Sequence, residues 1–208
     1  MSEAANRKLI TTLGQLAAIY GKPSGAALLK ETPGLTGPYR SIIEAAPFLT
    51  LATVGPGGLD CSPRGDAPGF VRVLDATTLA IPDRRGNNRT DSLSNIIQDP
   101  RVALLFLIPG MAETLRVNGR AEISIEPELL ASFAVDGKPP RSVLIVRIDS
   151  VYFQCAKSIV RSRLWDATTQ PSRSSLPTAG QMVAALVSDF DSKTYDAATP
   201  ARHKAELY

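Results

Sequence analysis

Between residues 48 and 153 the chain consists of short apolar or alternating runs separated by Gly, Pro, Asn and Asp, a pattern typical of strands and turns. The extended runs are 48–54, 59–64, 70–74, 77–81, 101–108, 114–123 and 143–153. Run 101–108 is almost wholly apolar, which predicts a strand buried on both faces, whereas run 114–123 alternates and predicts a half-buried antiparallel strand. We therefore expect a mainly β protein with peripheral helices, built on a six-stranded antiparallel barrel.

Helical spacing is restricted to the ends of the chain and to short connections. The predicted helices are 7–20, 39–46, 91–97, 127–133 and a last one that places Met182, Val183, Leu186 and Val187 on one face. Residues 166–178 are rich in Ser, Thr and Pro, which predicts a loop. We therefore expect a helical extension over 1–38, a barrel domain over 39–165, and a loop and C-terminal helix over 166–208 that pack on the barrel.

A polar segment from Ile81 to Ser92 leads out of one apolar run and into a predicted helix. Its side chains include three arginines, two asparagines, a threonine and a serine. Because a helix start attracts anions and a guanidinium group matches phosphate oxygens, this composition predicts an anion site, and most simply a phosphate site. The alternative is a solvated surface loop whose arginines bind nothing.

Composition narrows the class of protein. The 208 residues carry a net charge of +3, and no secretory signal or membrane-spanning apolar run is apparent, so we expect a cytoplasmic protein without membrane contact. The basic residues gather in 84–89 and 157–163, which favours discrete anionic groups over nucleic acid. A lone His203 makes a metal site or a histidine-dependent triad improbable, and Cys61 and Cys155 are expected to be reduced and packed as small apolar groups.

Several local motifs form a set: Ser62-Pro63-Arg64-Gly65-Asp66, Pro68-Gly69-Phe70, the Pro82–Ser92 loop, Thr114-Leu115-Arg116-Val117 and Arg161-Ser162-Arg163-Leu164-Trp165. Together they resemble the pyridoxamine 5′-phosphate oxidase-like family of FMN-binding split barrels, in particular its uncharacterised branch of FMN-dependent enzymes. The resemblance covers roughly 48–165 and implies a split β-barrel. It also implies a homodimer with the flavin at the subunit interface.

The same resemblance implies roles for individual residues. The backbone of Ile81 and Pro82 would lie along the flavin ring, Arg89 and Ser92 with neighbouring Asn88 would hold the phosphate, and Ser62 and Arg64 would flank both. Thr114 stands where the oxidases carry a longer Gln that reaches the ring. The remaining candidates for cofactor or substrate contact are Lys157, Arg163 and Trp165.

Acidic residues near the loop have structural explanations. Asp83 and Asp91 are expected to orient neighbouring arginines, and Asp66 is expected to order a turn or pair with an arginine. Residues 192–208 lack the Trp- and Arg/His-containing segment with which the oxidases hold pyridoxine, so vitamin B6 oxidation is not the expected activity.

The leading hypothesis is an FMN-dependent oxidoreductase that acts on a small substrate or a nicotinamide. The chemistry would belong to the cofactor, which agrees with the lack of a recognisable nucleophile and base pair in the sequence. A non-catalytic flavin-binding or flavin-sensing protein is the second hypothesis. The deazaflavin F420 is the alternative cofactor, for which Arg84, Arg85, Lys157 and Arg161 would form a broader basic groove.

Overall fold

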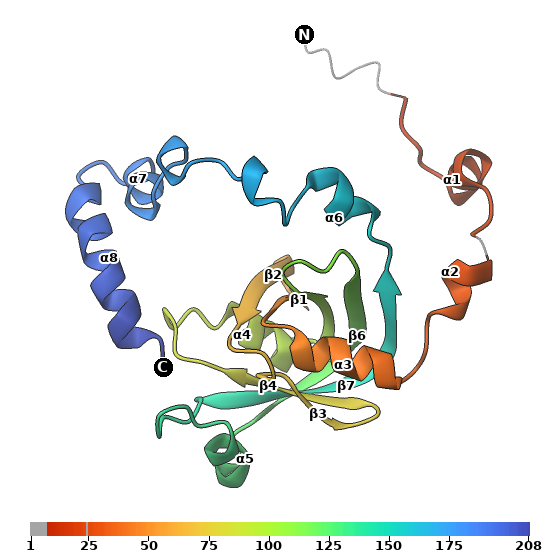
Figure 1. Cartoon of the computed structure of the whole chain (residues 1–208), viewed down its shortest axis with the longest axis horizontal. Helices are drawn as coiled ribbons and strands as arrows, with labels where there is room; N and C mark the ends of the chain where they lie inside the picture. Colours follow the sequence, from red (N-terminus) through yellow and green to blue (C-terminus); the bar gives the residue numbers. More distant parts are fainter. Residues whose placement is uncertain (1–7, 24) are drawn as a thin grey trace. The chain divides into compact units, whose positions relative to one another are not determined.

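The computed structural model describes residues 8–23 and 25–208, and its contacts divide the chain into a unit up to Glu31 and a main unit from Thr32 to Tyr208 (Figure 1). The first unit carries α1 (Leu13–Tyr20) and α2 (Gly25–Leu29). The side chain of Thr12 caps α1 by accepting a hydrogen bond from the Gln15 N–H, and Gly21 ends the helix at a φ of 68°. The helix predicted for residues 7–20 therefore starts later than expected, at Leu13. Residue 7, the first residue of the predicted helix, lies outside the described range. The helix α2 was not predicted.

In the main unit, the described strands form one antiparallel sheet in the order β2-β1-β5-β6-β7-β4-β3. Their bounds are β1 Phe48–Gly55, β2 Gly58–Gly65, β3 Arg72–Asp75, β4 Thr78–Asp83, β5 Arg101–Leu107, β6 Thr114–Ser124 and β7 Ser142–Gln154. Every extended run of the sequence is thus a strand. The prediction of six strands was one too few among the described residues, because the short run that becomes β3 also pairs, at the sheet edge beside β4.

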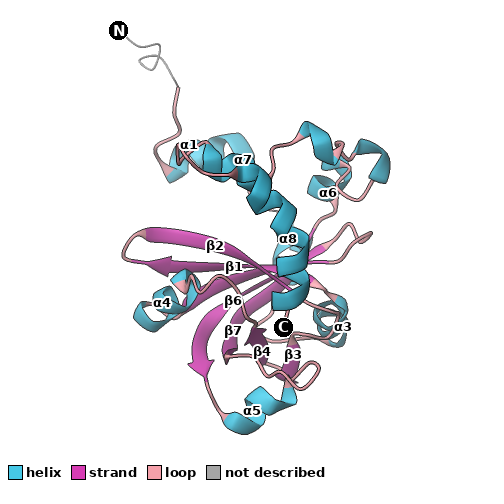
Figure 2. Ribbon diagram, turned by 90° about the vertical axis from the view of Figure 1, so that its left-hand side faces the viewer, coloured by secondary structure: helices cyan, strands magenta, loops and turns pink. Residues whose placement is uncertain are grey.

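The core is formed by buried apolar side chains of β1, β4, β5, β6 and β7, which belong to the sheet drawn in magenta in Figure 2. Its largest fully buried members are Ile43, Leu49, Leu51, Leu79, Ile81, Leu104, Phe106, Leu115 and Leu144. In β5 buried and half-buried residues alternate, so this nearly continuous apolar run is not buried on both faces as predicted. Its second face, with Ala103 and Leu105, is half-buried.

Helices cover parts of this sheet and carry the chain between its strands. The helices α3 (Gly37–Ala45) and α4 (Asp91–Gln98) supply Tyr39, Ile43 and Ile96 to the core, and α5 (Pro127–Ser132) packs beside β7. After β7 come α6 (Lys157–Ser162), the short 3₁₀ turns Ala167–Thr169 and Arg173–Ser175, α7 (Ala179–Ala184) and α8 (Ser192–Glu206).

Two differences from the sequence interpretation occur in the tail. The predicted C-terminal helix ends at Ala184, so Leu186 and Val187 lie beyond it and are exposed. The longest described helix, α8, has no buried residue and contains Pro200, so the apolar periodicity that reveals the other helices is missing from it.

Candidate functional site

The polar segment between β4 and α4 begins while the chain is still a strand, because Ile81, Pro82 and Asp83 belong to β4. These three residues pair with β7, but β3 pairs with β4 only as far as Ala80. Pro82 has no N–H to donate and therefore fits a strand that is an edge on one side. In the described chain, the last part of β4 thus leaves one backbone edge without a strand partner next to the loop, although Ile81 and Pro82 are buried.

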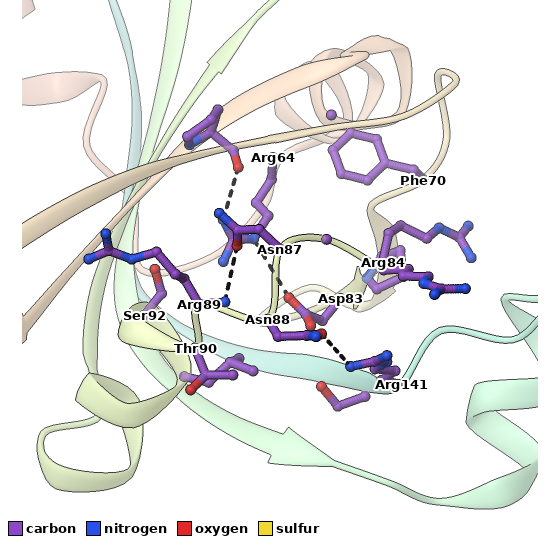
Figure 3. Close-up of a pocket in the computed structure, with 17 residues that line it drawn as sticks. Arg64, Phe70, Asp83, Arg84, Asn87, Asn88, Arg89, Thr90, Ser92 and Arg141 are labelled. Atoms are coloured by element: carbon purple, nitrogen blue, oxygen red, sulfur yellow. Dashed lines mark hydrogen bonds and ion pairs between the residues drawn. The ribbon is translucent and has the colours of Figure 1, made fainter. Parts of the chain in front are cut away.

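The loop closes one side of a cavity of about 340 Å³ (Figure 3). Residues from β2, the β2–β3 connection, β4, the loop, α4 and the chain at the start of β7 line it: Pro63, Arg64, Gly65, Phe70, Pro82, Asp83, Arg84, Arg85, Gly86, Asn87, Asn88, Arg89, Thr90, Ser92, Leu93, Arg141 and Ser142. Small-molecule sites commonly fall in the range of 300–1,000 Å³, so the cavity is large enough for part of a nucleotide-sized ligand.

Five arginines line this cavity, and several are already held in place. The Arg84 side chain donates to Asp66 at 2.9 Å and to the Phe133 carbonyl at 2.8 Å, and Arg89 pairs with Asp91 at 2.8 Å. Arg141 donates to Asn88 Oδ1 at 2.7 Å, which fixes a residue whose φ is 61°. Asp91 and Asp66 therefore orient arginines, as predicted.

The buried polar end of the cavity is built by β2 and α4. The Ser92 side chain is 3% exposed and donates to Asp60 Oδ2 at 3.1 Å, while Ser62 donates to the same oxygen at 3.3 Å. The N-cap residue of α4, Thr90, makes no side-chain capping bond, so the first-turn N–H groups have no acceptor from that side chain. A helix start of this kind, next to several guanidinium groups, fits the donor set that a phosphate monoester needs.

The pKa values of two carboxyl groups near the cavity are shifted in opposite directions. Burial raises the pKa of Asp83 above its usual value and outweighs the attraction of Arg64, whose Nε lies 3.9 Å from Asp83 Oδ1, and of Arg141. Burial also raises the pKa of Asp66, but hydrogen bonds from Tyr208, Ala67 and Arg84 outweigh it, and the net pKa is lowered. Asp66 is thus a stable counter-ion of Arg84, as well as the acceptor that orders its own turn.

Only some of the site residues predicted from the sequence lie together in the structure. Arg64, Pro82, Asn88, Arg89 and Ser92 line the cavity, and Ser62 lies 3.3 Å from Ser92 between hydroxyl oxygens. Ile81 is 1% exposed, belongs to the core and does not line the cavity.

A second group of predicted residues lies at the other end of β7. Thr114 pairs with Gln154, Lys157 begins α6, and the Trp165 indole donates to the Met111 carbonyl at 2.7 Å. Asp83 of the cavity pairs with Ser142 instead, which is twelve residues earlier, or roughly 40 Å along the strand at about 3.3 Å per residue. Arg163, in turn, pairs with Asp166 at 2.6 Å. Thr114, Lys157, Arg163 and Trp165 therefore do not line the cavity of the described chain.

Two contributors to the cavity were missed at the sequence level. Arg141 reaches the site only because β7 pairs with β4, a relation that no local motif signals. Asp60 accepts the hydrogen bonds of Ser62 and Ser92, and it could have been found from its place two residues before Ser62 on the same face of β2.

Other predictions have simple outcomes. Cys61 and Cys155 are free thiols, but both are exposed, so the expectation that they pack as apolar groups was wrong. His203 is exposed, and no group of potential metal ligands occurs among the described residues. Among the described helices, none combines the length and the apolar composition that a membrane span requires.

Comparison with known proteins identifies the family. Residues 35–155, more than half of the chain, match the sequence profile of the pyridoxamine 5′-phosphate oxidase family. The chain therefore belongs to this family, and its architecture is the FMN-binding split barrel that the motifs implied. No curated protein matches the chain at a significant level.

Three solved structures illustrate the likeness of fold. HupZ of Group A Streptococcus shares 19% identity over 58% of this chain and 94% of its own, with a TM-score of 0.46. A provisionally assigned pyridoxamine 5′-phosphate oxidase from Lactobacillus delbrueckii shares 22% sequence identity over 58% of this chain and 95% of its own, also with a TM-score of 0.46. An FMN-binding protein from Syntrophomonas wolfei shares 14% sequence identity over 55% of this chain and 86% of its own, with a TM-score of 0.42.

Proposed function

We propose that this protein binds FMN in the arginine-lined cavity and works as an FMN-dependent oxidoreductase. The observation that carries the proposal is the convergence of five arginines, the buried Ser92 hydroxyl and the start of α4 on one cavity of about 340 Å³. The unpaired edge of β4 adjoins this donor set and offers backbone groups to a planar ring. Membership of the family supports the same ligand.

Each part of the site has a distinct task in this proposal. Arg64, Arg89, Thr90 and Ser92 would hold the phosphate, and the backbone at Ile81 and Pro82 would position the ring. FMN, when bound, supplies hydride exchange with a nicotinamide or another small organic substrate. The chain itself orients the ligand, balances its charge through the arginines and keeps water from the ring.

We further propose a homodimer in which the second group of residues serves the partner's cofactor. Thr114, Lys157, Arg163 and Trp165 lie too far along β7 to meet a ligand in the same protomer's cavity. In a twofold dimer these residues would approach the partner's cavity, and two equivalent sites would result. The half-exposed face of β1 and β5, with Ala52, Ala103 and exposed Leu59 around a shallow apolar hollow, is the surface that we assign to this contact.

The test is a fluorescence titration with FMN and with riboflavin, which lacks the phosphate. We expect FMN to bind more tightly, and Arg64→Ala to weaken FMN by at least tenfold while leaving riboflavin nearly unchanged, since a charge-assisted hydrogen bond contributes about 1.5–3 kcal/mol. Arg89→Ala should cost less, because the Arg89 side chain is 76% exposed and that of Arg64 only 21%.

Arg173→Ala is the matched control, because this exposed arginine lies outside the cavity lining. Equal losses of FMN and riboflavin affinity in Arg64→Ala would contradict a phosphate role for this arginine. Failure of the unmodified protein to bind either compound would contradict the cofactor assignment itself.

Turnover is tested separately from binding. Rapid reduction of the FMN-loaded protein by NADH or NADPH in a stopped-flow instrument would support an oxidoreductase. Tight FMN binding without reduction by these or other small donors would favour a flavin-binding or flavin-sensing protein.

A further inference from the structure

A second cavity of about 240 Å³ adjoins the first. Its lining residues are Arg84, Arg85, Lys138, Pro139, Pro140, Arg141 and Tyr208. Three of them, Arg84, Arg85 and Arg141, also line the first cavity, so the two hollows share a wall of guanidinium groups. A ligand that fills the first cavity therefore lies directly beside the second.

The positive charge of the second cavity is only partly balanced. Arg84 has Asp66 as its counter-ion and Arg141 attracts Asp83, but Arg85, Lys138 and Arg141 form no ion pair with a described side-chain carboxylate. Lys138 donates to the main-chain oxygen of Tyr208 at 3.2 Å, and Arg141 donates to the amide oxygen of Asn88. Three cations around one hollow repel one another, and an anionic group placed between them would relieve that repulsion.

The remaining walls of the second cavity are comparatively rigid. Pro139 and Pro140 restrict the backbone on one side. On the other side the Tyr208 hydroxyl donates to Asp66 Oδ1 at 2.6 Å, and the Arg84 guanidinium lies 5.4 Å from the Tyr208 ring centre. The hydrogen bond to Asp66 raises the pKa of Tyr208, so this phenol stays neutral and adds no negative charge to the cavity.

We propose that the second cavity is a subsite for a further anionic group, a phosphate or a carboxylate, carried beyond the phosphate that occupies the first cavity. This inference rests on the proposed function, because it places the FMN-type phosphate in the first cavity. Arg85, Lys138 and Arg141 are the residues that bind the additional group. The group belongs either to a flavin cofactor that extends past its phosphate or to an anionic co-substrate that binds beside the cofactor.

The experiment compares the unmodified protein with the variant Lys138→Gln, which removes a charge that lines the second cavity and not the first and keeps a side chain of similar length. Lys193→Gln is the control, because Lys193 is exposed on α8 and lines neither cavity. In the first arm, equilibrium titrations with FMN, FAD and F420 report on an extended cofactor. In the second arm, titrations of the FMN-loaded protein with NADH and NADPH report on a co-substrate.

We expect Lys138→Gln to lose about tenfold or more in affinity for at least one extended probe and to keep its FMN affinity within about twofold. A loss confined to FAD or F420 identifies the cofactor extension, and a loss confined to NADPH identifies the co-substrate. Unchanged affinity for all the extended probes, or an equal loss for FMN, would overturn the subsite. Failure of the unmodified protein to bind FMN, FAD and F420 would instead overturn the proposed function.

Discussion

Asp83 alone carries a carboxylate among the described residues that line the first cavity, where it stands 3.9 Å from Arg64. Because burial raises its pKa, the ionised form is less stable in the folded chain than in the unfolded chain. The resulting cost is absent at acid pH, where both states are protonated. It grows as the pH rises through the unfolded pKa of about 3.9 and is present in full above the folded pKa.

Replacement of Asp83 by Asn should therefore stabilise the ligand-free protein at neutral pH and have little effect near pH 3. The same change removes a negative charge next to the phosphate, so FMN affinity should rise about fivefold, corresponding to about 1 kcal/mol. Denaturant unfolding at the two pH values and an FMN titration check both expectations. Asp189→Asn, an exposed change outside the cavity lining, is the control. Weaker FMN binding would instead mean that Asp83 positions Arg64 for the ligand.

At the scale of single residues, contacts between residues close in the sequence are easier to predict than contacts between residues far apart in it. The pairs Arg89–Asp91 and Asp66 with its own turn join residues that are neighbours along the chain, so spacing alone indicates them. The contact of Arg141 with Asn88 spans 53 positions and depends on the pairing of β4 with β7. Such a relation becomes visible only when strand order and register are known.

The element that defines the site is the β4–loop–α4 unit, and its outline could be predicted because apolar strand, polar loop and amphipathic helix follow one another without interruption. The helix α8 could not be predicted from the sequence, since none of its residues is buried. A third kind of feature, the irregularity of β6 at Asn118 and Gly119, has no signal apart from the glycine itself. There β6 approaches β7 so closely that a Cβ atom on Gly119 would lie 2.1 Å from the Arg147 carbonyl oxygen.

Gly119→Ala should consequently lower the free energy of unfolding by about 3 kcal/mol, near the upper end of common overpacking costs, because a main-chain atom cannot rotate away. Gly57→Ala, at a turn glycine with no atom within 4 Å of its added methyl group, should change the unfolding free energy by less than about 0.5 kcal/mol. Denaturant unfolding of both variants measures the difference. A Gly119→Ala protein as stable as the unmodified one would show that the β6–β7 pairing relaxes at this point.

At the scale of the whole molecule, the resemblance to a known family carries information that residue patterns alone do not. Strand order and the lining of the cavity follow from one chain, whereas the separation of the two groups of candidate residues along β7 is what the proposed dimer would explain, with a second copy contributing to each site. In that arrangement the exposed residues of β2 and the half-exposed faces of β1 and β5 would become buried. The exposed thiol of Cys61, which pairs with Ala52 in the sheet, would lie in or beside the same contact.

Leu59→Glu tests this arrangement, because the Leu59 side chain is 87% exposed and borders the apolar hollow on the outer sheet face. A buried charge without a partner would strongly disfavour the dimer, so light scattering should report a monomer where the unmodified protein is dimeric. FMN affinity should fall at the same time, since each cavity would lose the partner's Trp165 and Lys157. Leu186→Glu, at a site that is 86% exposed and remote in sequence, should change neither property. A Leu59→Glu protein that stays dimeric would place the subunit contact elsewhere, and a monomer with unchanged FMN affinity would show that one protomer holds the cofactor by itself.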